Sequence, residues 1–136
     1  PMKWIIEGTL AISPRPGYSP GLEMNVSASV VDLWIESLKE MGIRSIICLL
    51  GEDQLPLYRS ALTDGLIGYY VEKGFYVEHI PTNDGLTKPY TLQQLDEAWD
   101  AFRRLPLPVL VHCSAGHDRT GRVVKVILER LSEFEN

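Results

Sequence analysis

Residues 112–121 combine a cysteine, an arginine and several small residues in a spacing that could perform nucleophilic chemistry on a bound anion. The segment reads His112, Cys113, Ser114, Ala115, Gly116, His117, Asp118, Arg119, Thr120, Gly121. An apolar run precedes it and a helical pattern follows it, so we expect a loop between a strand and a helix N-terminus. Backbone N–H groups and the helix dipole concentrate positive charge at such a loop, which suits phosphate and favours the thiolate of Cys113.

Two further side chains of this segment can act on the same anion. Arg119 lies six positions after Cys113, and its planar guanidinium can hold two phosphate oxygens in a way that lysine cannot reproduce. Thr120 can donate its hydroxyl hydrogen to the sulfur and stabilise it as attacking and leaving group. The small residues at 114–116 let the backbone curl around the anion. A buried structural cysteine is the alternative, and these neighbours argue against it.

Strands that alternate with helices must position this loop. Apolar runs rich in β-branched residues predict strands at 4–12, 43–50, 75–80 and 109–112, the last three buried on both faces. Helical spacing predicts helices at 27–39, 91–105 and 121–134, with weaker signals up to residue 70. The alternation predicts an α/β fold with a central, mostly parallel sheet flanked by helices.

The predicted sheet places an acid beside the thiol. Ligands of parallel sheets bind at the carboxyl ends of the strands, where Cys113 follows one strand and Asp84 lies in the polar loop after another. Asp84 is therefore a candidate proton donor, although its neighbours also form a good turn sequence. Cys48 is interpreted as a core residue, with a disulfide to oxidised Cys113 as the alternative.

Residues 112–121 resemble the catalytic loop of the protein tyrosine and dual-specificity phosphatases, which reads His-Cys, five residues, Arg, Ser or Thr, Gly. The loop from Ile80 to Pro89 is similar to the acid-bearing loop of the small dual-specificity members. Ser13–Pro16 matches that family in position. The resemblance extends over nearly the whole chain, but only the catalytic loop is highly specific.

This resemblance implies a two-step reaction that needs neither a metal nor an organic cofactor. Cys113 would attack phosphorus, Asp84 would protonate the leaving oxygen and then activate water, and His112 would orient the loop. Some bacterial and lipid-directed relatives carry a loop aspartate in the place of Asp118, which makes it the rival general acid. The phosphate-binding residues would be Ser114, Ala115, Gly116, His117, Asp118 and Arg119.

The implied substrates are proteins phosphorylated on tyrosine, and also on serine or threonine. A phosphoinositide, inositol phosphate or nucleotide is the alternative with the same chemistry. His117 is interpreted as a solvated loop residue, with a bias of the site toward phosphorylated sugars or inositides as the alternative. Two alternatives come from other classes, a rhodanese-like sulfurtransferase and a non-catalytic phosphate-binding module. Thr120, Gly121 and Asp84 argue against the first, and the complete set of catalytic residues argues against the second.

The composition and net charge restrict the class of protein, its binding partners and its cellular compartment. The chain has 136 residues, of which 45% are hydrophobic, and a net charge of −5, which is typical of a globular domain and unfavourable for binding nucleic acid or an anionic membrane. No apolar run approaches the roughly 18 residues of a membrane span. Two cysteines fit a reducing cytoplasm, and no Cys/His spacing suggests zinc.

We therefore expect one monomeric, cytoplasmic phosphatase domain over residues 1–136. Pro1, which stands before Met2, is interpreted as lying outside the natural start. Members of the resembled family usually continue with further helices after the last predicted one. The expected domain is thus either minimal or shortened at its C-terminus.

Overall fold

The computed structural model describes residues 2–82 and 90–135 and contains one five-stranded sheet. Its strands are β1 (Lys3–Ile6), β2 (Leu10–Ser13), β3 (Ser45–Cys48), β4 (Tyr76–His79) and β5 (Val109–His112). They lie in the order β1-β2-β5-β3-β4. β1 is antiparallel to β2, and the other neighbours are parallel. The predicted α/β fold with a mostly parallel central sheet is confirmed.

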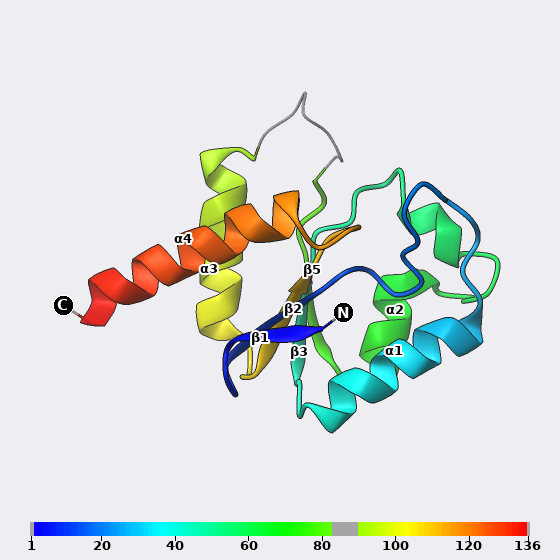
Figure 1. Cartoon of the computed structure of the whole chain (residues 1–136), viewed down its shortest axis with the longest axis horizontal. Coiled ribbons are helices and arrows are strands. Elements are labelled where there is room, and N and C mark those ends of the chain that lie inside the picture. Colours follow the sequence, from blue (N-terminus) through cyan, green and yellow to red (C-terminus); the bar gives the residue numbers. More distant parts are fainter. Residues whose placement is uncertain (1, 83–89, 136) are drawn as a thin grey trace.

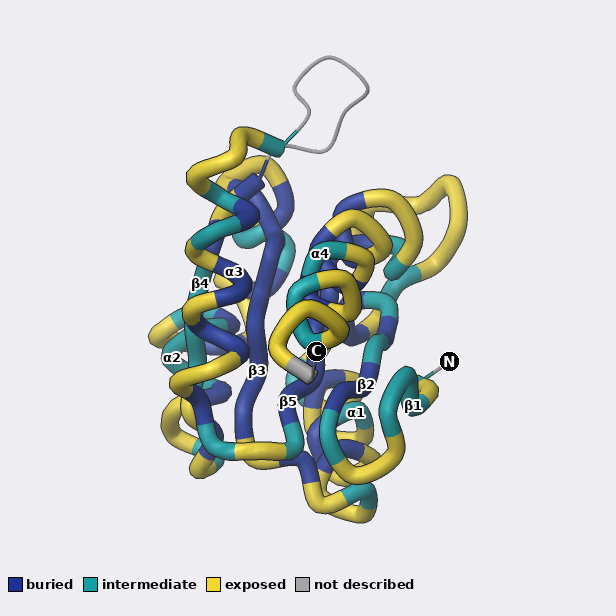
Figure 2. The backbone as a smooth tube through the Cα atoms, turned by 90° about the vertical axis from the view of Figure 1, so that its left-hand side faces the viewer, coloured by how far each residue is buried: buried dark blue, intermediate teal, exposed yellow. Residues whose placement is uncertain are grey.

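Helices cover both faces of the sheet. In the described chain they are α1 (Ala28–Glu40), α2 (Gly65–Glu72), α3 (Leu92–Arg104) and α4 (Asp118–Glu135), with a short 3₁₀ helix, η1, at Leu55–Tyr58. Figure 1 shows α1 and α2 on one face and α3 and α4 on the other, and each pair packs with the sheet into its own apolar core. The central strands β3 and β5 are buried along their whole length, and β3 is plainly visible as such in Figure 2.

The predicted helix starts agree with the observed caps in two cases. Ser27 precedes α1 and accepts a hydrogen bond from the backbone N–H of Val30, and Thr91 forms a capping box with Gln94 at the start of α3. The last helix begins at Asp118, three residues before the predicted start at Gly121. The difference arises because the last residues of the catalytic loop themselves form the first turn of α4.

Two strand predictions need correction. The run 4–12 is a hairpin rather than one strand, because Gly8 has a φ of 71° that reverses the chain between β1 and β2. The run 75–80 is an edge strand rather than one buried on both faces. β4 pairs only with β3 in the described sheet, and Tyr76 is 54% exposed.

The register of the parallel strands brings their carboxyl ends to one edge of the sheet. Ser13 of β2 pairs with His112 of β5, which in turn pairs with Cys48 of β3, and Cys48 pairs with His79 of β4. The residues that follow these strands therefore meet at the same edge, as the sequence predicts.

Candidate active site

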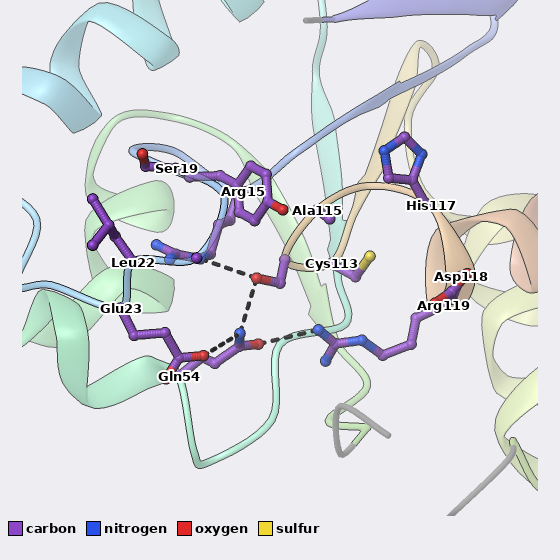
Figure 3. A pocket seen from close by; sticks show the side chains of 13 residues that line it. Arg15, Ser19, Leu22, Glu23, Gln54, Cys113, Ala115, His117, Asp118 and Arg119 are labelled. Carbon is purple, nitrogen blue, oxygen red and sulfur yellow. Dashed lines mark hydrogen bonds between the residues drawn. The ribbon is translucent and has the colours of Figure 1, made fainter. Parts of the chain in front are cut away.

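A cleft of about 630 Å³ opens at this edge of the sheet (Figure 3). The catalytic-loop residues that line it are Cys113, Ser114, Ala115, His117, Asp118 and Arg119. Cys113 is only 2% exposed and Arg119 only 7%, so the thiol and the guanidinium lie deep in the cleft. The opposite wall comes from Arg15, Tyr18, Ser19, Gly21, Leu22, Glu23 and Gln54. The structure thus brings the predicted nucleophile and the predicted phosphate-binding arginine into one cavity.

The catalytic loop packs tightly against the segment after β2. The backbone N–H of Arg15 donates to the carbonyl of Ser114 at 2.8 Å. Gly116 has a φ of 83°, and a Cβ atom there would lie 2.9 Å from the backbone nitrogen of Pro14. Both the backbone angle and the close approach require glycine. Gly116 is therefore needed for the close packing of the catalytic loop against the segment after β2. This requirement adds to the one from the sequence, that the backbone curl around an anion.

His112, the last residue of β5, holds the start of the catalytic loop through its two ring nitrogens. Its Nδ1 lies 3.0 Å from the carbonyl oxygen of Cys113, and its Nε2 lies 3.0 Å from the hydroxyl of Tyr70. Because a carbonyl can only accept, Nδ1 carries the hydrogen and Nε2 accepts from Tyr70. Burial lowers the pKa of His112 to about 4, so the ring is neutral at pH 7 and this tautomer persists.

An aromatic residue of α1 supports the same arrangement. The ring of Trp34 stacks on Tyr70 and meets His112 edge-on, with centroids 5.5 and 5.4 Å apart. Its indole N–H also lies within hydrogen-bond distance of the Ser13 hydroxyl and the Pro14 carbonyl. The helical spacing that predicts a helix at 27–39 gives no indication of these contacts. In the fold Trp34 connects α1 to the loop that supports Gly116.

Arg119 is held by oxygen atoms from two other loops. Its guanidinium donates to the carbonyl of Thr82 at 2.9 Å and to Oε1 of Gln54 at 3.1 Å. Thr82 is itself held by Leu49, whose carbonyl accepts from its hydroxyl at 2.8 Å. The plane of the guanidinium is thereby set by the loops after β3 and β4. Such preorganisation reduces the entropy lost when an oxyanion binds.

Gln54 is a site residue that sequence reasoning missed. It is 1% exposed, and its Nε2 donates to the Ser114 hydroxyl at 2.9 Å and to Glu23 at 3.3 Å. A glutamine in a loop between apolar segments gives no sequence signal for such a role. Burial of an uncharged amide is costly unless it is hydrogen-bonded, and here both ends of the amide are bonded.

Arg15, from the segment Ser13–Pro16, is part of the cleft wall. It is 2% exposed, and its guanidinium donates to the hydroxyls of Ser114 and Tyr58 at 3.2 and 3.1 Å. Burial raises the pKa of Tyr58 to about 12, so its phenol keeps its hydrogen and donates to the Pro16 carbonyl at 2.6 Å. Two guanidinium groups, from opposite walls, therefore face one cavity.

The remaining predicted residues divide into three groups. His117 and Asp118 are exposed and line the cleft, and Ala115, which is half-buried, lines it as well. Thr120 is buried, but its hydroxyl has no hydrogen-bond partner within residues 2–82 and 90–135, so the expected bond to the sulfur of Cys113 is not made in this structure. Asp84 lies outside the described residues.

Cys48 lies on the other side of the sheet from Cys113. It belongs to the apolar core beneath α1 and α2, whereas Cys113 belongs to the core beneath α3 and α4. Both thiols are free. Burial raises the pKa of Cys48 to about 12, which leaves it protonated and unreactive. These observations support the core interpretation of Cys48 over the disulfide alternative.

The described residues contain neither a metal-binding cluster nor a membrane-spanning helix. No group of three or more His, Cys, Asp or Glu side chains within 2–82 and 90–135 could hold a metal ion. Within the same ranges, no helix has both the length and the apolar character needed to cross a bilayer.

The chemistry that the cleft can perform follows from its parts. A thiol lies in a loop before the N-terminus of the 18-residue helix α4, where backbone N–H groups and the helix dipole attract an anion. A guanidinium held by Thr82 and Gln54 faces the same space. A sulfur nucleophile and a fixed oxyanion holder are the two groups that displacement at phosphorus requires.

Solved structures with the same fold include protein tyrosine phosphatases and a PP-IP phosphatase. A mutant form of Tk-PTP has a TM-score of 0.66 and 23% identity, covering 93% of this chain and 69% of its own. A Leishmania major protein tyrosine phosphatase has a TM-score of 0.57 and 23% identity, with coverages of 85% and 63%. The catalytic core of the Saccharomyces cerevisiae PP-IP phosphatase SIW14 has a TM-score of 0.57 and 16% identity, with coverages of 88% and 59%.

The sequence itself identifies the family. A comparison with curated proteins finds no match. Residues 21–133, which include the whole catalytic loop and Gln54, match the family described as "Polymorphic toxin system, DSP-PTPase phosphatase". The match covers well over half of the chain. The chain therefore belongs to this DSP-PTPase phosphatase family.

Proposed function

We propose that the chain hydrolyses phosphate monoesters of proteins, phosphotyrosine above all, through a cysteinyl-phosphate intermediate on Cys113. The observation that carries the proposal is that the thiol of Cys113 and the anchored guanidinium of Arg119 line the floor of one cleft. A nucleophile that must stay reduced also fits a cytoplasmic location.

In the first step the Cys113 thiolate attacks phosphorus, an S–P bond forms and the bond from phosphorus to the ester oxygen breaks. Arg119 and the loop N–H groups hold the three non-bridging oxygens while negative charge is redistributed. A general acid gives a proton to the departing oxygen, so that an alcohol or phenol leaves.

In the second step a water molecule attacks the phosphorus of the cysteinyl phosphate. The conjugate base of the same acid removes a proton from this water, the S–P bond breaks, and the thiolate and inorganic phosphate are restored. We propose Asp84 as the acid, on the basis of its sequence position five residues after the end of β4. Asp118, exposed at the start of α4 and lining the cleft, is the rival.

Burial of the floor supports phosphotyrosine as the main substrate. Because Cys113 is almost fully buried, a phosphate must reach it on a long, narrow side chain. Tyr18 and the exposed Leu22 line the wall above it and offer apolar surface for an aryl ring. A phosphoserine side chain is several ångströms shorter and makes neither contact.

A substrate panel tests this assignment. We expect kcat/KM for phosphotyrosine peptides to exceed that for matched phosphoserine peptides by about 100-fold, because aryl burial is worth a few kcal/mol. The measurement is release of inorganic phosphate at equal substrate concentrations. Equal rates on both peptides would contradict the deep-cleft argument.

A small polyphosphate is the second candidate, and Arg15 and His117 favour it. Both line the same cleft as Arg119, and the guanidinium of Arg15, as a second cation, suits a second phosphate group. Inositol polyphosphates and nucleotides therefore belong in the same panel. A preference of more than about tenfold for one of them over phosphotyrosine would replace the protein substrate with this candidate.

The acid is assigned by comparing Asp84→Asn with Asp118→Asn on two leaving groups. Loss of a general acid costs about 10²- to 10⁴-fold and costs most when the leaving oxygen is strongly basic. We expect Asp84→Asn to slow hydrolysis of phenyl phosphate far more than that of an aryl phosphate with a weakly basic leaving group. Asp118→Asn should slow both by the same small factor. The reverse pattern would assign the proton to Asp118.

A further inference from the structure

The hydroxyl of Ser114 occupies an unusual position in the network across the cleft. It lies 3.2 Å from Nε of Arg15 and 2.9 Å from Nε2 of Gln54. Nε of an arginine can only donate, so Ser114 accepts from Arg15. In Figure 3, dashed lines run from the labelled side chains of Arg15 and Gln54 toward the loop that carries Cys113.

The contact with Gln54 has the same direction. Oε1 of Gln54 lies 3.1 Å from a guanidinium nitrogen of Arg119, and an arginine cannot accept. The amide oxygen must therefore face Arg119, which turns the amide NH₂ toward Ser114. Glu23, whose carboxylate also lies beside this NH₂ at 3.3 Å, requires the same orientation.

A serine hydroxyl has two acceptor lone pairs and one hydrogen. With both lone pairs occupied by N–H donors, the hydrogen is left with one remaining tetrahedral direction. No hydrogen bond among the described residues uses Ser114 as the donor to another protein group. Ser114 is 7% exposed and lines the cleft beside the thiol.

We propose that Ser114 donates its hydroxyl hydrogen to a non-bridging oxygen of the phosphoryl group that binds over Cys113. Arg15 and Gln54 are the positioning residues, because they occupy both lone pairs and leave the hydrogen without an acceptor among residues 2–82 and 90–135, so that it can turn to the ligand. This assignment rests on the proposed phosphatase function and adds a side-chain donor to the backbone N–H groups of the loop.

The arrangement also explains why a neutral amide stands between Ser114 and Arg119. A carboxylate at position 54 could accept from Arg119 equally well, but it would also accept from Ser114. The serine hydrogen would then turn away from the ligand. Only a group that accepts on one side and donates on the other serves both neighbours.

The first test measures binding of tungstate, an unreactive oxyanion, to the full chain by calorimetry. Ser114→Ala should weaken binding about 10- to 100-fold, the value of one hydrogen bond to a charged group. Ser114→Thr keeps the hydroxyl and should restore most of it. Ser132→Ala removes an exposed hydroxyl of α4 that does not line the cleft and should leave the affinity unchanged.

The second test is a double-mutant cycle with Gln54→Glu. In the wild-type background this change should weaken tungstate binding both through the added charge and through capture of the Ser114 hydrogen. In the Ser114→Ala background only the charge effect remains, so the loss should be about tenfold smaller. Thermal unfolding of each variant confirms that the fold is retained.

Three results would overturn the proposal: unchanged tungstate affinity in Ser114→Ala, failure of Ser114→Thr to restore binding in a folded protein, or equal losses from Gln54→Glu in both backgrounds. If the proposed phosphatase function were wrong, the experiments would give a different set of results. The wild type would then hydrolyse no phosphate ester, while tungstate binding would still depend on Ser114.

Discussion

Replacement of Cys113 by serine is expected to lower kcat for aryl phosphates by about 10⁴-fold or more, the scale on which loss of a nucleophile acts in enzymes with covalent intermediates. A serine hydroxyl at this position has no adjacent base among the described residues, since His112 already uses both ring nitrogens. The alkoxide needed for attack therefore does not form. Single-turnover release of phenol measures the loss.

The same variant should still bind an oxyanion. The guanidinium of Arg119 keeps its anchors on Thr82 and Gln54, and the change from sulfur to oxygen leaves the loop backbone in place. Tungstate affinity within about tenfold of the wild type is expected. Cys48→Ala, which removes the other thiol from the opposite core, is the matched control and should keep full turnover. Undiminished hydrolysis by Cys113→Ser would refute the covalent mechanism.

Arg119→Lys is expected to lower kcat/KM by about 10²- to 10³-fold, although the positive charge is kept. The guanidinium is held in one plane by the Thr82 carbonyl and the Gln54 amide oxygen, 2.9 and 3.1 Å away. A lysine ammonium cannot satisfy these two acceptors and also present two parallel donors to a phosphate. The decrease in rate should be largest in the chemical step, because the geometry of the phosphate oxygens changes there.

Steady-state kinetics on an aryl phosphate separate this effect from a loss of charge. Arg122→Lys, on an exposed position of the same helix, is the control and should change kcat/KM by less than about twofold, as surface substitutions do. If Arg119→Lys retained wild-type kcat and altered only KM, Arg119 would contribute general attraction rather than oriented hydrogen bonds.

Local sequence signals predicted much of the fold because the interactions concerned are local. The caps at Ser27 and Thr91 involve residues three positions away, so the chain carries the whole signal in one segment. The continuous apolar runs of β3 and β5 likewise indicate burial on both faces. The catalytic loop was recognisable for the same reason, since Cys113 and Arg119 lie on one short segment.

Predictions failed where a single residue or the position in the sheet decided the structure. Gly8 divides the apolar run 4–12 into the two strands of a hairpin. The apolar character of the run does not predict that the chain turns at this glycine. Whether the strand at 76–79 is central or at the edge depends on which strands become its neighbours. At atomic scale, the buried hydroxyl of Thr120 makes no hydrogen bond to any described residue, although the motif suggests one to the sulfur.

The sequence by itself indicated a candidate nucleophile and a candidate phosphate-binding arginine, and it determined the α/β alternation and the edge of the sheet where both residues lie. Only the tertiary structure decided what holds them. Arg15 reaches Ser114 across 99 positions, Gln54 reaches Arg119 across 65, and Tyr70 reaches His112 across 42. Strand order and loop packing decide which of these distant residues become hydrogen-bond partners. The residues around an isolated glutamine or tyrosine form no local sequence pattern that predicts such a partner.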